Sequence, residues 1–162
     1  MAALTATENA NLVWQRVKAS LAGANPAIQE AFRGLKLILA TQYKNPNLQI
    51  LQFAQADVAG SNTGAILGTG APKIFAVYGK KGTVGTSAYL TICDSPTDAA
   101  TGATHRIALE ASGAGDEVVF IDTAPAAWIT GVCVVSKTTL TGTTVSTGAT
   151  TAFDGFLIVG GY

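Results

Sequence analysis

The chain has 162 residues, of which 12% are charged and 48% are hydrophobic, and its formal net charge at pH 7 is zero. This length suffices for one domain with a substantial apolar core. The balanced charge argues against a dedicated nucleic-acid-binding protein, because such proteins carry a basic excess that neutralises phosphates. A monomer with so few charged residues has little protection against self-association. We therefore expect the chain to bury surface in an oligomer or a larger particle.

Residues 1–46 predict a helical hairpin. Thr7 is the expected N-cap of the first helix, with Glu8 in the first turn, where the helix dipole favours an acidic group. Gly23 is placed to end this helix. The apolar face of the first helix, at spacings of three and four residues, comprises Ala10, Val13, Trp14, Val17 and Leu21.

A second helix is expected to begin at Asn25-Pro26, with Asn as the cap and Pro in the first helical position, and to close at Asn45-Pro46. Together the two helices predict an N-terminal arm over residues 1–46, attached to a body over residues 47–162. The apolar face of the second helix comprises Ile28, Ala31, Phe32, Leu35, Leu39 and Tyr43.

Each helix also carries a leucine opposite its apolar face, Leu12 in the first and Leu37 in the second. Tolerated surface leucines and a second contact face both fit this pattern. Residues 1–45 hold five basic and two acidic residues, a net charge of +3, and residues 46–162 hold five basic and eight acidic residues, a net charge of −3. An arm of this charge suits docking on an acidic protein surface or on a neighbouring copy. The residues predicted to contact the partner are Leu12, Trp14, Arg16, Arg33, Lys36 and Leu37.

The body predicts short strands. Residues 48–56 fit either a strand or a last amphipathic segment, and residues 57–72 predict a long loop. Residues 137–151, rich in Thr and Gly, predict an exposed hairpin or a loop with strand-like ends. A hairpin turn is expected at residues 79–82. The other strands are expected at residues 73–78, 87–93, 104–111, 117–122, 127–136 and 153–159.

The run at residues 127–136, AWITGVCVVS, is almost continuously apolar and predicts a strand buried on both faces. No helical pattern lies between the strands, so the crossovers of a parallel sheet are missing. We therefore predict a mainly β fold, an antiparallel β-sandwich of jelly-roll or Greek-key type with an N-terminal helical hairpin arm.

The sequence carries no recognisable catalytic or cofactor motif. His105 is the single histidine, and a zinc site would require Cys93, Cys133 and a carboxylate to converge on it. A Ser–His–Asp arrangement with Asp122 lacks a nucleophile elbow, and the glycines at residues 64–70 lack the Gly-Lys-Ser/Thr ending of a phosphate loop. We expect no enzyme, no cofactor and no bound metal. Calcium at Asp94 and Asp98 is left open.

The two cysteines lie in apolar, strand-like runs, which favours buried thiols in a reducing compartment. A disulfide would require the two strands to be neighbours. The segment MAALTATENAN lacks the regions of a secretory signal, and no apolar run approaches the ~20 residues that span a membrane. We expect a protein made in a cytoplasm, without a membrane partner.

In layout the chain resembles the capsid decoration (cement) proteins of tailed bacteriophages. The shared features are a small, charge-poor β-sandwich, Thr- and Gly-rich loops, no secretion signal and an N-terminal helical hairpin. The resemblance implies a non-catalytic virion protein, often a trimer, that binds between the coat subunits of an assembled shell, including the major capsid protein, and reinforces it. The alternatives are a tail or fibre component, a carbohydrate-binding sandwich with Trp128 or Tyr89 in its platform, and an enzyme with an unrecognised site.

Overall fold

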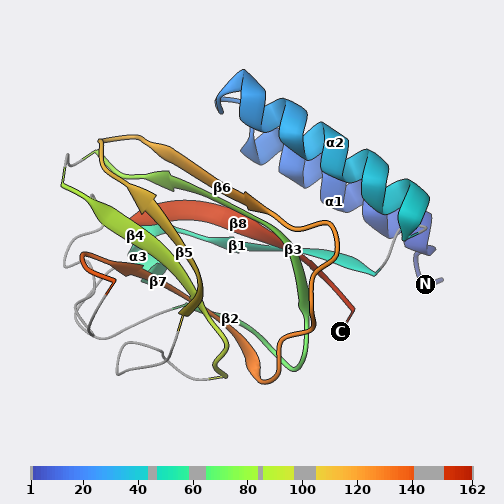
Figure 1. Ribbon diagram of the computed structural model, residues 1–162. Coiled ribbons are helices and arrows are strands. Elements are labelled where there is room, and N and C mark those ends of the chain that lie inside the picture. The colour runs from blue at the N-terminus through green and yellow to red at the C-terminus, as the bar shows by residue number, and fades with distance from the viewer. Residues whose placement is uncertain are drawn as a thin grey trace.

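The computed structural model of the chain describes residues 2–43, 47–58, 65–83, 86–96, 105–140 and 152–161. The fold is mainly β, as predicted: two four-stranded antiparallel sheets lie face to face, and two helices cover one of them (Figure 1). The elements are α1 (Ala6–Ser20), α2 (Pro26–Gln42), β1 (Leu48–Phe53), α3 (Gln55–Val58), β2 (Ala65–Thr69), β3 (Lys73–Lys81), β4 (Ala88–Cys93), β5 (His105–Ala111), β6 (Glu117–Ile121), β7 (Gly131–Lys137) and β8 (Phe153–Gly160).

The strand order is β1-β8-β3-β6 in one sheet and β2-β7-β4-β5 in the other. All neighbouring strands are antiparallel, which confirms that part of the prediction. Each strand therefore pairs with its counterpart counted from the other end of the series: β1 with β8, β2 with β7, β3 with β6 and β4 with β5.

The apolar core between the two sheets is built from the inward side chains of both, among them Leu90, Val134 and Leu157. Strand β7 is buried along its whole length, which confirms the strand with two covered faces. It begins at Gly131, however, because the backbone of residues 129–131 binds the side chain of Asp94. Lys137, the first residue of the segment predicted as an exposed hairpin or a loop with strand-like ends, is the last residue of β7 and is buried, which fits a strand-like end but not an exposed hairpin. Residues 141–151 lie outside the described residues.

Two further differences concern glycine-rich segments. The predicted turn at residues 79–82 is wrong, because β3 continues through Lys81 and Gly79 pairs with both Val118 and Gly155. A Cβ atom on Gly79 would lie 2.6 Å from Leu90 Cδ2, so this glycine allows close packing of the sheets. Strand β2 lies in the segment predicted as a long loop.

The first helix begins earlier than predicted. Its N-cap is Thr5, whose Oγ1 accepts a hydrogen bond from Glu8 N (3.2 Å), while Glu8 Oε2 accepts one from Thr5 N (2.8 Å). A capping box requires Glu or Gln three residues after the cap, which Thr5 has in Glu8 and Thr7 lacks. The helix ends at Ser20, before Gly23. In α2, the predicted cap Asn25 with Pro at the start of the helix is confirmed.

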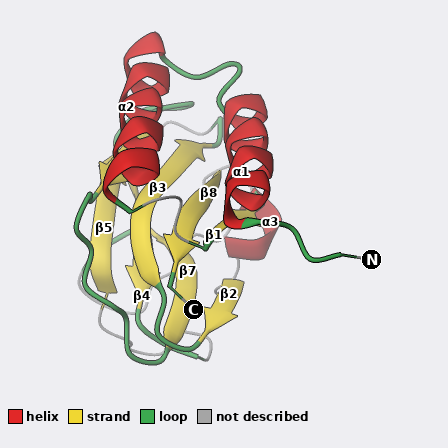
Figure 2. Ribbon diagram, turned by 90° about the vertical axis from the view of Figure 1, so that its right-hand side faces the viewer, coloured by secondary structure: helices red, strands yellow, loops and turns green. Residues whose placement is uncertain are grey.

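The two helices pack side by side on the outer face of the β1-β8-β3-β6 sheet (Figure 2). Phe32 of α2 meets Phe156 of β8 edge-on, with ring centroids 5.5 Å apart, and Tyr43 meets Phe75 of β3 in the same way. The pairing of β3 with β8 shifts register between Ile74 and Ala76. At this irregularity the consecutive side chains of Phe75 and Ala76 both lie in the core beneath the helices. Except for Ala31, which is exposed, the predicted apolar faces point into this core.

Polar contacts also tie the helical segment to the sheet that it covers. Glu117 of β6 accepts hydrogen bonds from the backbone N of Asn25, in the turn between the helices, and from the hydroxyl of Tyr78 (2.9 and 2.6 Å). Asn9 Nδ2 donates to the Leu48 carbonyl (2.9 Å). In this chain α1 and α2, the two predicted helices of the N-terminal segment, therefore pack on the β1-β8-β3-β6 sheet as a third layer of the fold.

Candidate functional site

The outer surface of the helical layer carries the exposed apolar side chains that the sequence placed there. Leu12 of α1 is 47% exposed and Leu37 of α2 is 66% exposed, and both lie opposite the buried faces of their helices. The apolar faces of the helices pack against the sheet, and these two leucines lie outside that core. Contact between them and a partner stays a prediction.

Between α1 and α2 lies a groove with a volume of about 640 Å³. The edges of buried apolar side chains form its floor, and polar and basic side chains stand along it. The residues that line it are Asn11, Trp14, Gln15, Val17, Lys18, Leu21, Ala22, Gln29, Phe32, Arg33 and Lys36.

The charges along this groove are all positive. Lys18 comes from α1 and Arg33 and Lys36 come from α2, and no acidic residue is among those that line it. Arg33 Nη1 lies 2.7 Å from Glu30 Oε1, but both side chains are largely exposed, and a surface pair of this kind contributes little. The groove is therefore a basic channel over an apolar floor.

The structure brings three of the six predicted partner-contact residues together in the groove, namely Trp14, Arg33 and Lys36. Leu12, Leu37 and Arg16 do not line it. Trp14 is only 7% exposed because its ring packs in the core beneath the helices, so it is mainly a core residue with an edge on the groove, and its contact with a partner stays a prediction. Sequence reasoning missed Lys18 and Gln29, which occupy the groove-facing side of their helices.

The chain matches no protein-family model, no curated protein and no solved structure. The groove and its charges are therefore the basis for the functional proposal.

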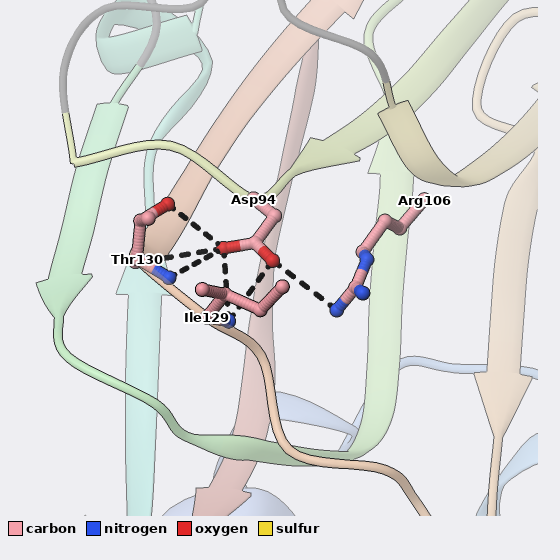
Figure 3. A network of polar contacts seen from close by, with 5 residues as sticks. Asp94, Arg106, Ile129 and Thr130 are labelled. Carbon is pink, nitrogen blue, oxygen red and sulfur yellow. Dashed lines mark hydrogen bonds and ion pairs between the residues drawn. The ribbon is translucent and has the colours of Figure 1, made fainter.

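Asp94, left open as a calcium ligand, is fully engaged by the protein (Figure 3). Its Oδ1 accepts hydrogen bonds from Thr130 N (2.8 Å) and Thr130 Oγ1 (3.0 Å), and its Oδ2 accepts one from Ile129 N (3.0 Å). Arg106 Nη1 lies 3.2 Å from the same Oδ2. With donors on both oxygens, Asp94 acts as a clamp that fixes the approach to β7, and Asp98 lies outside the described residues.

Arg106, which pairs with Asp94, also covers Trp128, the tryptophan considered for a carbohydrate-binding platform. The guanidinium of Arg106 lies over the Trp128 ring, 5.4 Å from its centroid, and Trp128 is buried. A sugar-stacking platform needs an exposed ring face, which Trp128 does not offer.

Asp94→Asn is expected to lower the free energy of unfolding by about 2 kcal/mol at pH 7, because an amide presents an N–H group to donors that require an acceptor. Burial raises the pKa of Asp94, but hydrogen bonds from the backbone of Thr130 and Ile129 outweigh it, so the pKa lies below its ordinary value. The stabilisation from the charge is therefore complete well above pH ~3.9 and is lost as the pH falls through the folded-state pKa.

Urea unfolding of wild type and Asp94→Asn near pH 7, 5 and 3 measures this effect. The difference between the two proteins should be full at the two higher values and smaller at the lowest. A difference that does not change with pH would show that the charge of Asp94 has no part in the clamp.

The residues that a zinc site would have required pair in a row across the β2-β7-β4-β5 sheet. His105 of β5 pairs with Cys93 of β4, and Cys93 pairs in turn with Cys133 of β7. Within the described part of the chain, however, no three His, Cys, Asp or Glu side chains are grouped so that they could hold a metal ion.

The two cysteines, which are not joined by a disulfide, offer a test of the β4–β7 register. Directly opposed residues of antiparallel strands have Cα atoms about 4.5–5.5 Å apart, within the range that a disulfide spans. We expect diamide to oxidise the two thiols to an intramolecular disulfide, itself being reduced to the hydrazine. Burial raises the pKa of the Cys93 thiol, so the reaction should be slow at neutral pH and faster in alkali.

Mass spectrometry of the oxidised chain would read the result. A monomer lighter by two hydrogens, and no such product from Cys93→Ser, would agree with the register. Disulfide-linked dimers as the main product would contradict it.

Over the described segments, no helix is long and apolar enough to cross a membrane.

Proposed function

We propose that this chain is a structural, non-catalytic virion protein that binds an assembled shell of coat subunits and reinforces it, as capsid decoration proteins do. The observation that carries the proposal is the strand pairing. The four pairs β1·β8, β2·β7, β3·β6 and β4·β5 form one long antiparallel ribbon, and successive pairs alternate between the two sheets.

A folded ribbon of this kind is the arrangement of a jelly roll, and we propose that fold here. Jelly rolls of eight strands recur in viral capsid proteins, lectins and cupins. Fold alone does not fix a function, so the choice among these classes depends on the surface. The burial of Trp128 under Arg106 speaks against a lectin, and the lack of a histidine-based metal group in the described segments speaks against a cupin.

The helical layer supports a docking function. It is held on the sheet by a shared apolar core, and it presents Leu12 and Leu37 together with a basic groove to the solvent. A fixed layer loses little conformational freedom on binding, which favours affinity. We propose that acidic surfaces of coat subunits, the major capsid protein among them, bind this layer, and that the chain also self-associates, as a trimer.

Light scattering after size exclusion tests the self-association. Wild type should elute as a defined oligomer, and the double variant Leu12→Lys, Leu37→Lys should remain folded by circular dichroism but shift toward smaller species. Ile129→Lys is the matched control, since Ile129 is an exposed aliphatic residue outside the helical layer. A wild type that stays monomeric at high concentration would refute self-association, and an Ile129→Lys variant that alone dissociates would move the interface elsewhere.

A further inference from the structure

We infer that the groove between α1 and α2 binds an acidic amphipathic α-helix of a partner protein, which lies along the two helices as a third. This inference rests on the proposed function, since it takes the helical layer as the docking side. It adds the chemical nature of the occupant and the residues that recognise it.

The dimensions of the groove fit a helix. Its lining runs from Asn11 to Lys18 along α1 and from Gln29 to Lys36 along α2, in each case about 10 Å or two helical turns at 1.5 Å per residue. Two helices that lie side by side leave a furrow into which the side-chain ridges of a third helix can pack. Helix-in-groove binding uses anchors at i, i+3 or i+4 and i+7, which span about two turns and so match this length.

The floor supplies the apolar part of the contact. The edges of Trp14, Leu21 and Phe32 face the groove, and these side chains are rigid because the core behind them holds them. The aliphatic stems of Lys18 and Lys36 extend this apolar surface, as long charged side chains commonly do. A partner helix with an apolar stripe would cover this surface and exclude water from it.

The basic side chains of the groove determine which charged residues a partner helix can carry beside its apolar stripe. Lys18, Arg33 and Lys36 meet no acidic side chain within the groove, apart from the exposed contact of Arg33 with Glu30 just outside it. Asp or Glu beside the apolar stripe of an incoming helix would approach these cations, while Lys or Arg would be repelled. Charge complementarity of this kind governs specificity and the rate of encounter.

A nucleic acid is the weaker occupant. Three cations neutralise few phosphates, and the chain as a whole has no net charge to attract a polyanion. The floor is also an assembly of ring and side-chain edges packed into the core, not an exposed aromatic face on which a base could stack.

The test uses full-length protein and fluorescently labelled synthetic peptides of about 18 residues, long enough for three to five helical turns. The acidic probe has an apolar stripe at helical spacing flanked by Glu. A second probe keeps the stripe and replaces every Glu with Lys, and a third keeps the Glu residues and replaces the stripe with Ser. An oligo(dT) strand is the nucleic-acid probe.

We expect fluorescence anisotropy to show binding of the acidic amphipathic probe, at least tenfold tighter than binding of the other three. Lys36→Glu should weaken this binding about tenfold, in line with the loss of a favourable charge contact and the gain of a repulsive one. Lys73→Glu is the matched control, because it changes the net charge equally at the exposed start of β3, outside the helical layer. Its effect should stay below about twofold, the size expected of a distant, screened charge.

Each contrary result overturns the inference. These results are no binding of the acidic probe, equal binding of the Lys or Ser probe, tighter binding of oligo(dT), and equal weakening by the two charge reversals. If Lys36→Glu instead dissociates the oligomer while no peptide binds, the occupant is a second copy of this chain. Peptide binding by a protein that stays monomeric would refute the proposed self-association alone, so the two failures are distinguishable.

Discussion

Phe156→Ala is expected to lower the free energy of unfolding by about 3–5 kcal/mol, the usual cost of truncating a buried phenylalanine. Phe156 is 1% exposed and belongs to the core between β8 and the helices. It meets Phe32 edge-on at 5.5 Å between centroids and Tyr78 at 5.4 Å. The truncation would therefore remove contacts that both the sheet and the helical layer use.

Urea unfolding followed by circular dichroism and by tryptophan fluorescence measures this effect. Because the helices share a core with the sheet, both signals should shift to lower urea together in the variant. Leu37→Ala is the control: this exposed side chain should change the stability by less than about 0.5 kcal/mol. Loss of the helical signal well before the rest, already in the wild type, would contradict a shared core.

Gly155→Ala is expected to destabilise the chain by about 3 kcal/mol or more, because its methyl group has no space. Gly155 of β8 lies opposite Gly79 of β3. A Cβ atom at Gly155 would collide with the carbonyl oxygen of Tyr78 and would lie 2.9 Å from Gly79 Cα. Both are backbone atoms, so no rotation of a side chain can relieve the overlap and the central strands must separate.

Gly34→Ala is the matched control for this substitution. Gly34 lies in α2, its added Cβ would meet nothing within 4 Å, and alanine is the better helix former by about 1 kcal/mol. Thermal unfolding should therefore show a lower midpoint for Gly155→Ala and a higher one for Gly34→Ala. A wild-type midpoint for Gly155→Ala would mean that the two strands do not approach so closely.

The elements that the sequence predicts well are those with a strong period. The apolar faces that contain Trp14 and Phe32 define α1 and α2, and the uninterrupted run before Lys137 defines a strand with two covered faces. The turn predicted at residues 79–82 is wrong because glycine is common both in turns and where two sheets approach closely. Which of the two applies depends on the packing partner, here Leu90, which the sequence does not reveal.

The groove could be predicted only in part. The spacing of Arg33 and Lys36 places them on one side of α2, but their position facing Trp14 depends on how the two helices lie on the sheet. Trp14 shows the same limit, because an aromatic residue on an amphipathic helix suits a core and a partner surface equally. In the structure, Trp14 packs in the core on the outer face of the sheet, together with Phe75 and Phe156.

Hydrogen exchange of the native protein tests most directly the central claim that the helices are a fixed layer of the fold and a rigid docking platform. The slowest amides of α1 and α2, around Val17 and Leu35, should exchange with the same free energy of opening as those of β8, because all three meet in one core. Exchange of the helical amides through an opening of only about 1–2 kcal/mol, while β8 stays protected, would contradict it: the helices would then be a detachable arm.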